Sequence, residues 1–81
     1  MGSKRPHPQK VFHTARKYGL FAMSSGHERD FKYEFWNKTT GKWVMSYYPD
    51  RGFWTATNNR KGNAQDYRDA LIAALVIPEV S

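Results

Sequence analysis

Few residues of this sequence have the types and spacing that catalysis needs. His27, Glu28 and Asp30 form a local cluster of a histidine with carboxylates, and Asp66 and Asp69 are a carboxylate pair three residues apart. A solvated loop accounts for the first cluster. Acids in the first turns of a helix, where they interact favourably with the helix dipole, account for the second. The chain also has no cysteine, no glycine-rich phosphate loop and no motif around its serines. We therefore predict a non-catalytic protein without a metal or cofactor.

Aromatic residues among cations suggest binding instead. The segment 37–59 holds two tryptophans, two tyrosines and a phenylalanine, together with Lys38, Lys42 and Arg51. Aromatic rings stack on nucleic-acid bases while cations hold the phosphates. Tryptophan, tyrosine and arginine also dominate the binding energy of protein interfaces. The composition therefore leaves two partner classes open, a nucleic acid and a protein.

The charge distribution narrows the partner to an anionic one. The chain has 81 residues, with 13 Lys and Arg against 7 Asp and Glu, giving a net charge of +6. The excess positive charge lies in residues 1–17 and 38–61, whereas the C-terminal segment is mildly acidic. Such asymmetry indicates a polyanion or an acidic protein surface. The predicted binding residues are Lys4, Arg5, Lys10, Arg16, Lys17, Trp36, Lys38, Lys42, Tyr48, Arg51, Trp54, Arg60 and Lys61.

Hydrophobic periodicity predicts the elements that position these residues. Apolar residues recur at helical spacing over residues 8–18, before Gly19, and again from residue 64 until Pro78. Alternating patterns predict strands over residues 31–36, 43–48 and 53–57, joined by a hairpin loop at 37–41 and a turn at 49–52. Residues 58–63 read as a polar loop, and residues 19–23 as either a short strand or more helix. The predicted fold is α+β, a three-stranded antiparallel meander flanked by an N-terminal and a C-terminal helix. Residues 1–9 are expected to form a flexible basic arm and residues 10–78 a single domain.

Strand alternation also predicts which aromatic residues are core. Phe31, Tyr33 and Phe35 share one face, and Trp43, Met45 and Tyr47 form the bulkier side of the next strand, so both sets should face inward. The residues left facing outward are Trp36, Tyr48 and Trp54. Whether the helices cover one face of the sheet or both is left open by the sequence.

Two families resemble this chain. Gly41-Lys42-Trp43, the stretch Gly52-Phe53-Trp54-Thr55-Ala56 and an alanine-rich closing helix resemble the small phage-encoded "ABA sandwich" proteins over residues 8–76. This resemblance implies a phage origin rather than a mechanism. The segment PQKVFHTARKYGL resembles the first helix of double-stranded RNA-binding domains, and SGHERDFKYEF their following loop and strand. Those domains have a lysine cluster at the last helix, where this sequence has Asn63-Ala64-Gln65-Asp66.

We accordingly expect a non-catalytic domain, encoded by a phage or mobile element, that binds DNA or RNA through phosphate contacts and aromatic stacking. About six phosphate contacts would give log K against log salt a slope near −5 on duplex DNA. The alternative is a phage accessory protein that inhibits an acidic or nucleic-acid-binding host protein, such as a component of a defence complex. A homodimer through an exposed edge strand is also open. The sequence has neither a membrane span nor a signal peptide, so we expect a cytoplasmic protein, in the host cell if it is phage-encoded.

Overall fold

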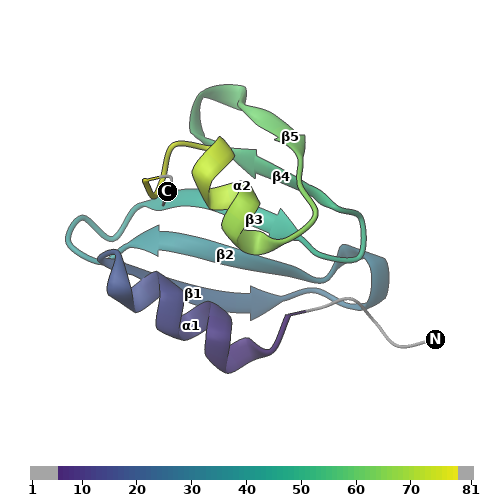
Figure 1. Cartoon of the computed structure of the whole chain (residues 1–81), viewed down its shortest axis with the longest axis horizontal. Helices are drawn as coiled ribbons and strands as arrows, with labels where there is room; N and C mark the ends of the chain where they lie inside the picture. Colours follow the sequence, from purple (N-terminus) through teal and green to yellow (C-terminus); the bar gives the residue numbers. More distant parts are fainter. Residues whose placement is uncertain (1–5, 79–81) are drawn as a thin grey trace.

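The computed structural model describes residues 6–78, and five antiparallel strands form its centre. Figure 1 shows the chain running from a helix through the sheet to a second helix. The elements are α1 (Pro8–Lys17), β1 (Leu20–Ser25), β2 (Lys32–Asn37), β3 (Trp43–Tyr48), β4 (Phe53–Ala56), β5 (Lys61–Asn63) and α2 (Tyr67–Ala73), with short 3₁₀ turns η1 (Glu28–Asp30) and η2 (Thr57–Asn59).

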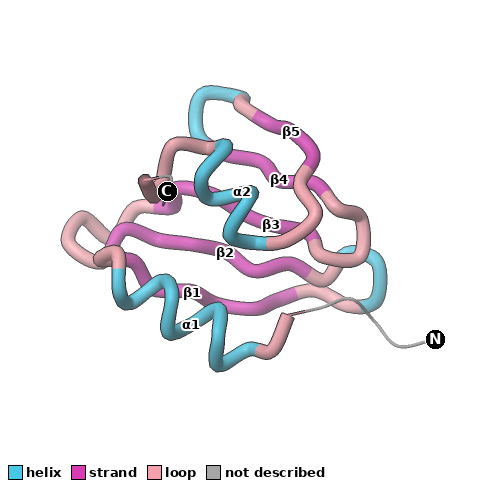
Figure 2. Tube along the Cα trace, in the orientation of Figure 1, coloured by secondary structure: helices cyan, strands magenta, loops and turns pink. Residues whose placement is uncertain are grey.

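The prediction of an α+β fold is confirmed, but a three-stranded sheet is wrong. The strands follow one another in the order β1-β2-β3-β4-β5, each antiparallel to the next (Figure 2). The extra strand β1 follows Gly19, whose φ of +75° ends α1 and turns the chain back along the sheet. The extra strand β5 is too short and polar to be predicted. It pairs with β4 because Asn58 and Asn59, with φ of 63° and 60°, make the tight turn that a hairpin needs.

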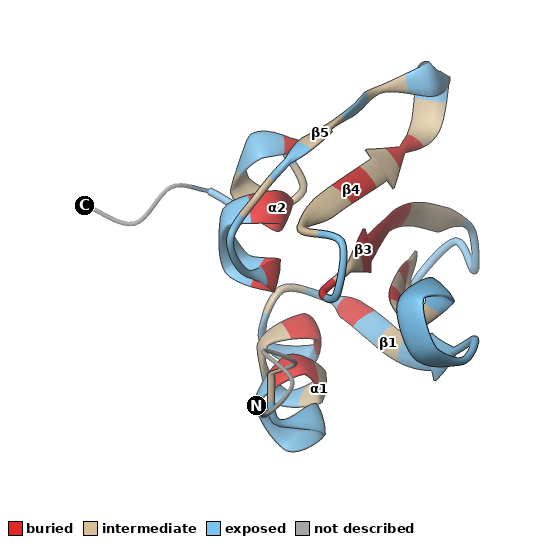
Figure 3. Ribbon diagram, turned by 90° about the vertical axis from the view of Figure 1, so that its right-hand side faces the viewer, coloured by how far each residue is buried: buried red, intermediate tan, exposed pale blue. Residues whose placement is uncertain are grey.

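Both helices pack on the same face of the sheet, as Figure 3 shows. They meet through Tyr67 at the start of α2, whose hydroxyl lies 3.1 Å from Thr14 Oγ1 and donates to the Lys10 carbonyl at 3.4 Å. The closing helix is shorter than predicted. Asp66 caps its start by accepting from the Asp69 amide at 2.9 Å, and Leu75, with φ of 62°, follows its end.

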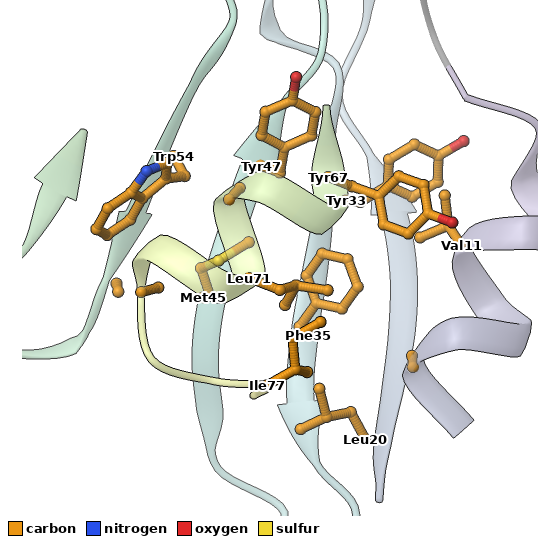
Figure 4. Close-up of a cluster of buried hydrophobic side chains, with 14 residues drawn as sticks. Val11, Leu20, Tyr33, Phe35, Met45, Tyr47, Trp54, Tyr67, Leu71 and Ile77 are labelled. Atoms are coloured by element: carbon orange, nitrogen blue, oxygen red, sulfur yellow. The ribbon is translucent and has the colours of Figure 1, made fainter. Parts of the chain in front are cut away.

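The core lies between this face and the helices (Figure 4). Tyr33, Phe35, Met45 and Tyr47 project from the central strands and are almost completely buried, as predicted. The Tyr47 hydroxyl donates to the Ala64 carbonyl at 3.1 Å. Burial, followed by the nearby negative charges of Asp66 and Asp69, raises the pKa of Tyr47 above its ordinary value.

Trp54 belongs to this core, so the prediction that it faces outward is wrong. It is 6% exposed and pairs with Tyr47 on one side and Gly62 on the other. Gly62 has no side chain, and a Cβ there would lie 3.0 Å from three atoms of the Trp54 indole. The indole therefore occupies the space that β5 leaves above its glycine, on the face that the helices cover.

Trp43 is displaced in the opposite direction by a β-bulge. The pairing of β2 with β3 shifts between Phe35, which faces Met45, and Trp36, which faces Trp43. The extra residue in β3 breaks the alternation that would place Trp43 beside Met45. The Trp43 indole instead donates to Ser46 Oγ at 2.8 Å, and Ser46 lies on the uncovered face. The prediction that Trp43 joins the core is wrong.

Candidate functional site

The face of the sheet opposite the helices carries aromatic and polar side chains in three rows that cross the strands. We call it the open face. The first row is Phe21, Trp36 and Trp43; the middle row is Met23, Glu34, Ser46, Thr55 and Lys61; the third row is Ser25, Lys32, Tyr48, Phe53 and Asn63. Neighbouring rows are two residues apart along β1 and β2, or about 6.7 Å, whereas on β3 the bulge places Trp43 three residues from Ser46.

The first row is a broad apolar surface. The rings of Phe21 and Trp36 are nearly parallel, with an interplanar angle of 10° and centroids 6.2 Å apart. Phe21 is 40% exposed, and Met23 beside it on the edge strand β1 is 49% exposed. The indole nitrogen of Trp36 is buried, so Trp36 offers a ring surface rather than a hydrogen-bond donor.

The third row joins two aromatic rings to a cation. Tyr48 and Phe53 stack with centroids 4.6 Å apart and an angle of 4° between the rings. Lys32 Nζ lies 5.9 Å from the centroid of Tyr48, which is within reach of a cation–π interaction. Each of the two rings covers one face of the other, so a planar group that approaches this row meets their outer faces and edges, with a positive charge beside Tyr48.

The middle row is polar apart from Met23 at its edge, and its Ser46 contacts the Trp43 indole. Ser46 is 2% exposed, and its hydroxyl accepts the Trp43 N–H, which fixes the orientation of the ring. Glu34 is the cross-strand neighbour of Ser46, and its Oε2 is 3.5 Å from Lys32 Nζ. A hollow next to this row is lined by Trp43, Thr55, Lys61 and the β4–β5 turn. One wall of the hollow is therefore aromatic and another carries a lysine.

The predicted cations are distributed over different parts of the molecule. Lys61 lies on the open face, and Lys38 and Lys42 are exposed in the adjoining β2–β3 loop. Lys10, Arg16 and Lys17 are exposed on α1, which covers the other face of the sheet. Lys4 and Arg5 lie outside the described residues. No single flat surface of the described chain collects the whole predicted set.

Two of the predicted cations have structural partners. Arg51 donates to the Arg29 carbonyl at 3.1 Å and pairs with Asp30 at 2.7 Å, which ties the β3–β4 turn to η1. Arg60 donates to the carbonyls of Thr57 at 3.2 Å and Ala74 at 2.8 Å, which holds the β4–β5 turn against the end of α2. These contacts occupy guanidinium N–H donors of both arginines, which would otherwise be available to bind phosphate.

Sequence reasoning found part of the open face and missed the rest. Trp36, Tyr48 and Lys61 are on it. The residues missed as site members are Phe21, Met23, Lys32, Glu34, Trp43, Phe53 and Thr55. The signal that could have found the edge strand is the alternation of Phe21 and Met23 with smaller neighbours. Residues 19–23 fit either a strand or a helix from the sequence alone, so this alternation did not identify the strand.

Other kinds of site are not seen in the described part of the chain. Residues 6–78 contain no group of three or more histidine, aspartate or glutamate side chains that could hold a metal ion. No helix within these residues has the length and apolar character needed to cross a membrane. Comparison with family models, with curated proteins and with solved structures found no match.

Proposed function

We propose that this protein binds single-stranded nucleic acid on the open face of its sheet, without catalysis. The observation that carries the proposal is the pair of aromatic rows, one containing Phe21 and Trp36 and the other Tyr48 and Phe53, on a face that the helices leave uncovered. Stacking on such rings contributes about 1–3 kcal/mol per base and tolerates any base.

Single strands suit this surface better than duplexes. Bases in a duplex are stacked on each other, so their flat faces are not available to protein rings, whereas unpaired bases are. The first and third rows are about 13 Å apart, since four residues of extended strand separate them. Lys32 within the third row and Lys61 at the edge of the middle row supply positive charge for the backbone between stacked bases.

The experiment is a titration with mixed-sequence single-stranded and double-stranded oligonucleotides, followed by tryptophan fluorescence. The parent protein should show saturable quenching and bind single strands more tightly. Phe21→Ala should weaken single-strand binding by about 5- to 150-fold, the equivalent of one stacked base. Because Phe21 is 40% exposed, its truncation should leave the fold intact, which circular dichroism would verify.

A matched control is Leu75→Ala. Leu75 is 83% exposed and follows α2, away from the three rows, so its truncation should leave the affinity unchanged. Absence of saturable quenching at low salt, or an equal loss for both variants, would refute binding at the open face.

A protein partner is the second candidate, and one observation favours it. Met23 and Phe21 are exposed together on the edge strand β1, and a flexible thioether beside an aromatic ring is typical of protein-binding surfaces. An inhibitor of a host protein would form a stoichiometric complex that Met23→Ala weakens. Loss of complex formation without any effect on oligonucleotide binding would identify this candidate.

A further inference from the structure

A carboxylate lies near the centre of the open face. Its negative charge would repel the phosphates of a nucleic acid bound there. Glu34 occupies the middle row, between Met23 on β1 and Ser46 on β3. Its side chain is 23% exposed, so it is accessible from the open face. Lys32 Nζ, 3.5 Å from Oε2, offsets part of the repulsion between this charge and phosphates.

The neighbours of Glu34 place it beside a stacking surface. Ser46 is directly across the strands from Glu34, and paired residues of this kind have Cβ atoms about 5 Å apart. The Ser46 hydroxyl holds the Trp43 indole N–H at 2.8 Å. The edge of a base stacked on Trp43 would therefore lie within reach of the Glu34 carboxylate.

The chemistry of a carboxylate determines which base edge it accepts. An ionised carboxylate is only an acceptor of hydrogen bonds. Cytosine and adenine present an exocyclic amino group, whereas thymine has a carbonyl oxygen at the equivalent position. An amino group can donate to Glu34, but the carbonyl oxygen of thymine would face it as a second acceptor. The N3–H of thymine is a donor, yet it lies between two carbonyl oxygens, so a carboxylate that accepts from it meets repulsion on both sides.

From this arrangement we infer that Glu34 is a specificity-determining residue, which accepts a hydrogen bond from the amino group of a base stacked on Trp43. The site takes cytosine or adenine in preference to thymine or uracil. This inference rests on the proposed binding of single strands at the open face. It adds base selection to a surface whose stacking rows alone would be indifferent to sequence.

The test compares oligo(dC), oligo(dA) and oligo(dT) of equal length, which share one phosphate backbone. Parent protein should bind oligo(dC) and oligo(dA) about tenfold more tightly than oligo(dT). Glu34→Gln retains the shape of the side chain but adds an amide donor that can pair with the thymine carbonyl. This variant should gain affinity for oligo(dT) and lose most of the preference.

Asp69→Asn is the matched control, because it removes the same charge from α2 on the covered side of the sheet. It should keep the parent preference. Equal binding of the three oligonucleotides by the parent protein would overturn the role of Glu34 while leaving the proposed function standing. Retention of the preference in Glu34→Gln, or an equal gain for all oligonucleotides in both variants, would also overturn it. Failure of every oligonucleotide to bind would refute the proposed function itself.

Discussion

The division of the lysines between two sides of the molecule predicts a weak salt dependence for single-strand binding. Lys61 lies on the open face, and Lys38 and Lys42 are exposed in the adjoining β2–β3 loop. The charge of Lys32 is offset by Glu34, 3.5 Å away, so Lys32 is not counted as a phosphate contact. Each phosphate contact on a single strand contributes about −0.7 to the slope of log K against log salt. Three contacts therefore give a slope of about −2, well short of the −5 expected from the sequence for six contacts on a duplex.

This slope is measurable as a modest loss of affinity. Raising the salt concentration from about 50 to 200 mM should weaken single-strand binding roughly 20-fold. Tryptophan fluorescence titrations with one mixed-sequence oligonucleotide at several salt concentrations give the slope directly. Lys61→Ala should make the slope less steep by about 0.7 units, because one phosphate contact is lost.

Lys10→Ala is the matched control for this measurement. Lys10 is an exposed lysine of α1, on the side of the sheet that the helices cover. Its removal subtracts the same charge but no contact on the open face, so the slope should stay near −2. A slope near −5 in the parent protein, or an equal change for both variants, would show that the strand contacts the helices and would refute the reasoning.

The other predictions concern stability. The pKa of Tyr47 is higher in the folded chain than in the unfolded chain, where it is about 10. The stability that Tyr47 contributes to the folded state is therefore fully present below about pH 10 and is lost as the pH rises through the folded pKa. Urea unfolding between pH 9 and about 12 should show this decline, and Tyr47→Phe should flatten it while lowering stability at neutral pH by about 1 kcal/mol. Gly62→Ala should cost about 1–3 kcal/mol and alter the near-ultraviolet circular dichroism of Trp54, since the new methyl meets the indole; an unchanged spectrum and melting temperature would contradict this packing. Arg60→Ala should lower the melting temperature without changing oligonucleotide affinity, because the Arg60 guanidinium donates to two carbonyls of the chain. A weaker affinity at unchanged stability would indicate that Arg60 contacts phosphate instead.

Local patterns were sufficient to predict the first helix and the central strands. Gly19 marks the end of α1, and the alternation of Tyr33 and Phe35 gives the buried face of β2 correctly. Each of these signals resides in consecutive residues, whose side chains point to alternate faces wherever a strand is regular.

The outward residues were harder to predict because they depend on pairing between strands. Trp43 leaves the core through a bulge whose position is determined by the register of β2 against β3. Trp54 enters the core because a glycine happens to be its neighbour on β5, a strand too short to be recognised alone. Both errors concern tryptophans, whose side chains can lie on the covered or on the open face of a sheet. The pairing with the neighbouring strand therefore determines the face on which each one lies.

The strictly sequential order of the strands has a consequence for how the chain reaches its native state. Every strand pairs with the one that precedes it, so the sheet can grow by successive hairpins that close short loops only. The contacts between Tyr67 and α1 are different, because they join residues 53 and 57 positions apart. Rapid formation of the sheet, followed by docking of α1 and α2 through Tyr67, is the folding order that this topology favours. Substitution of Tyr67 should then accelerate unfolding far more than it slows folding.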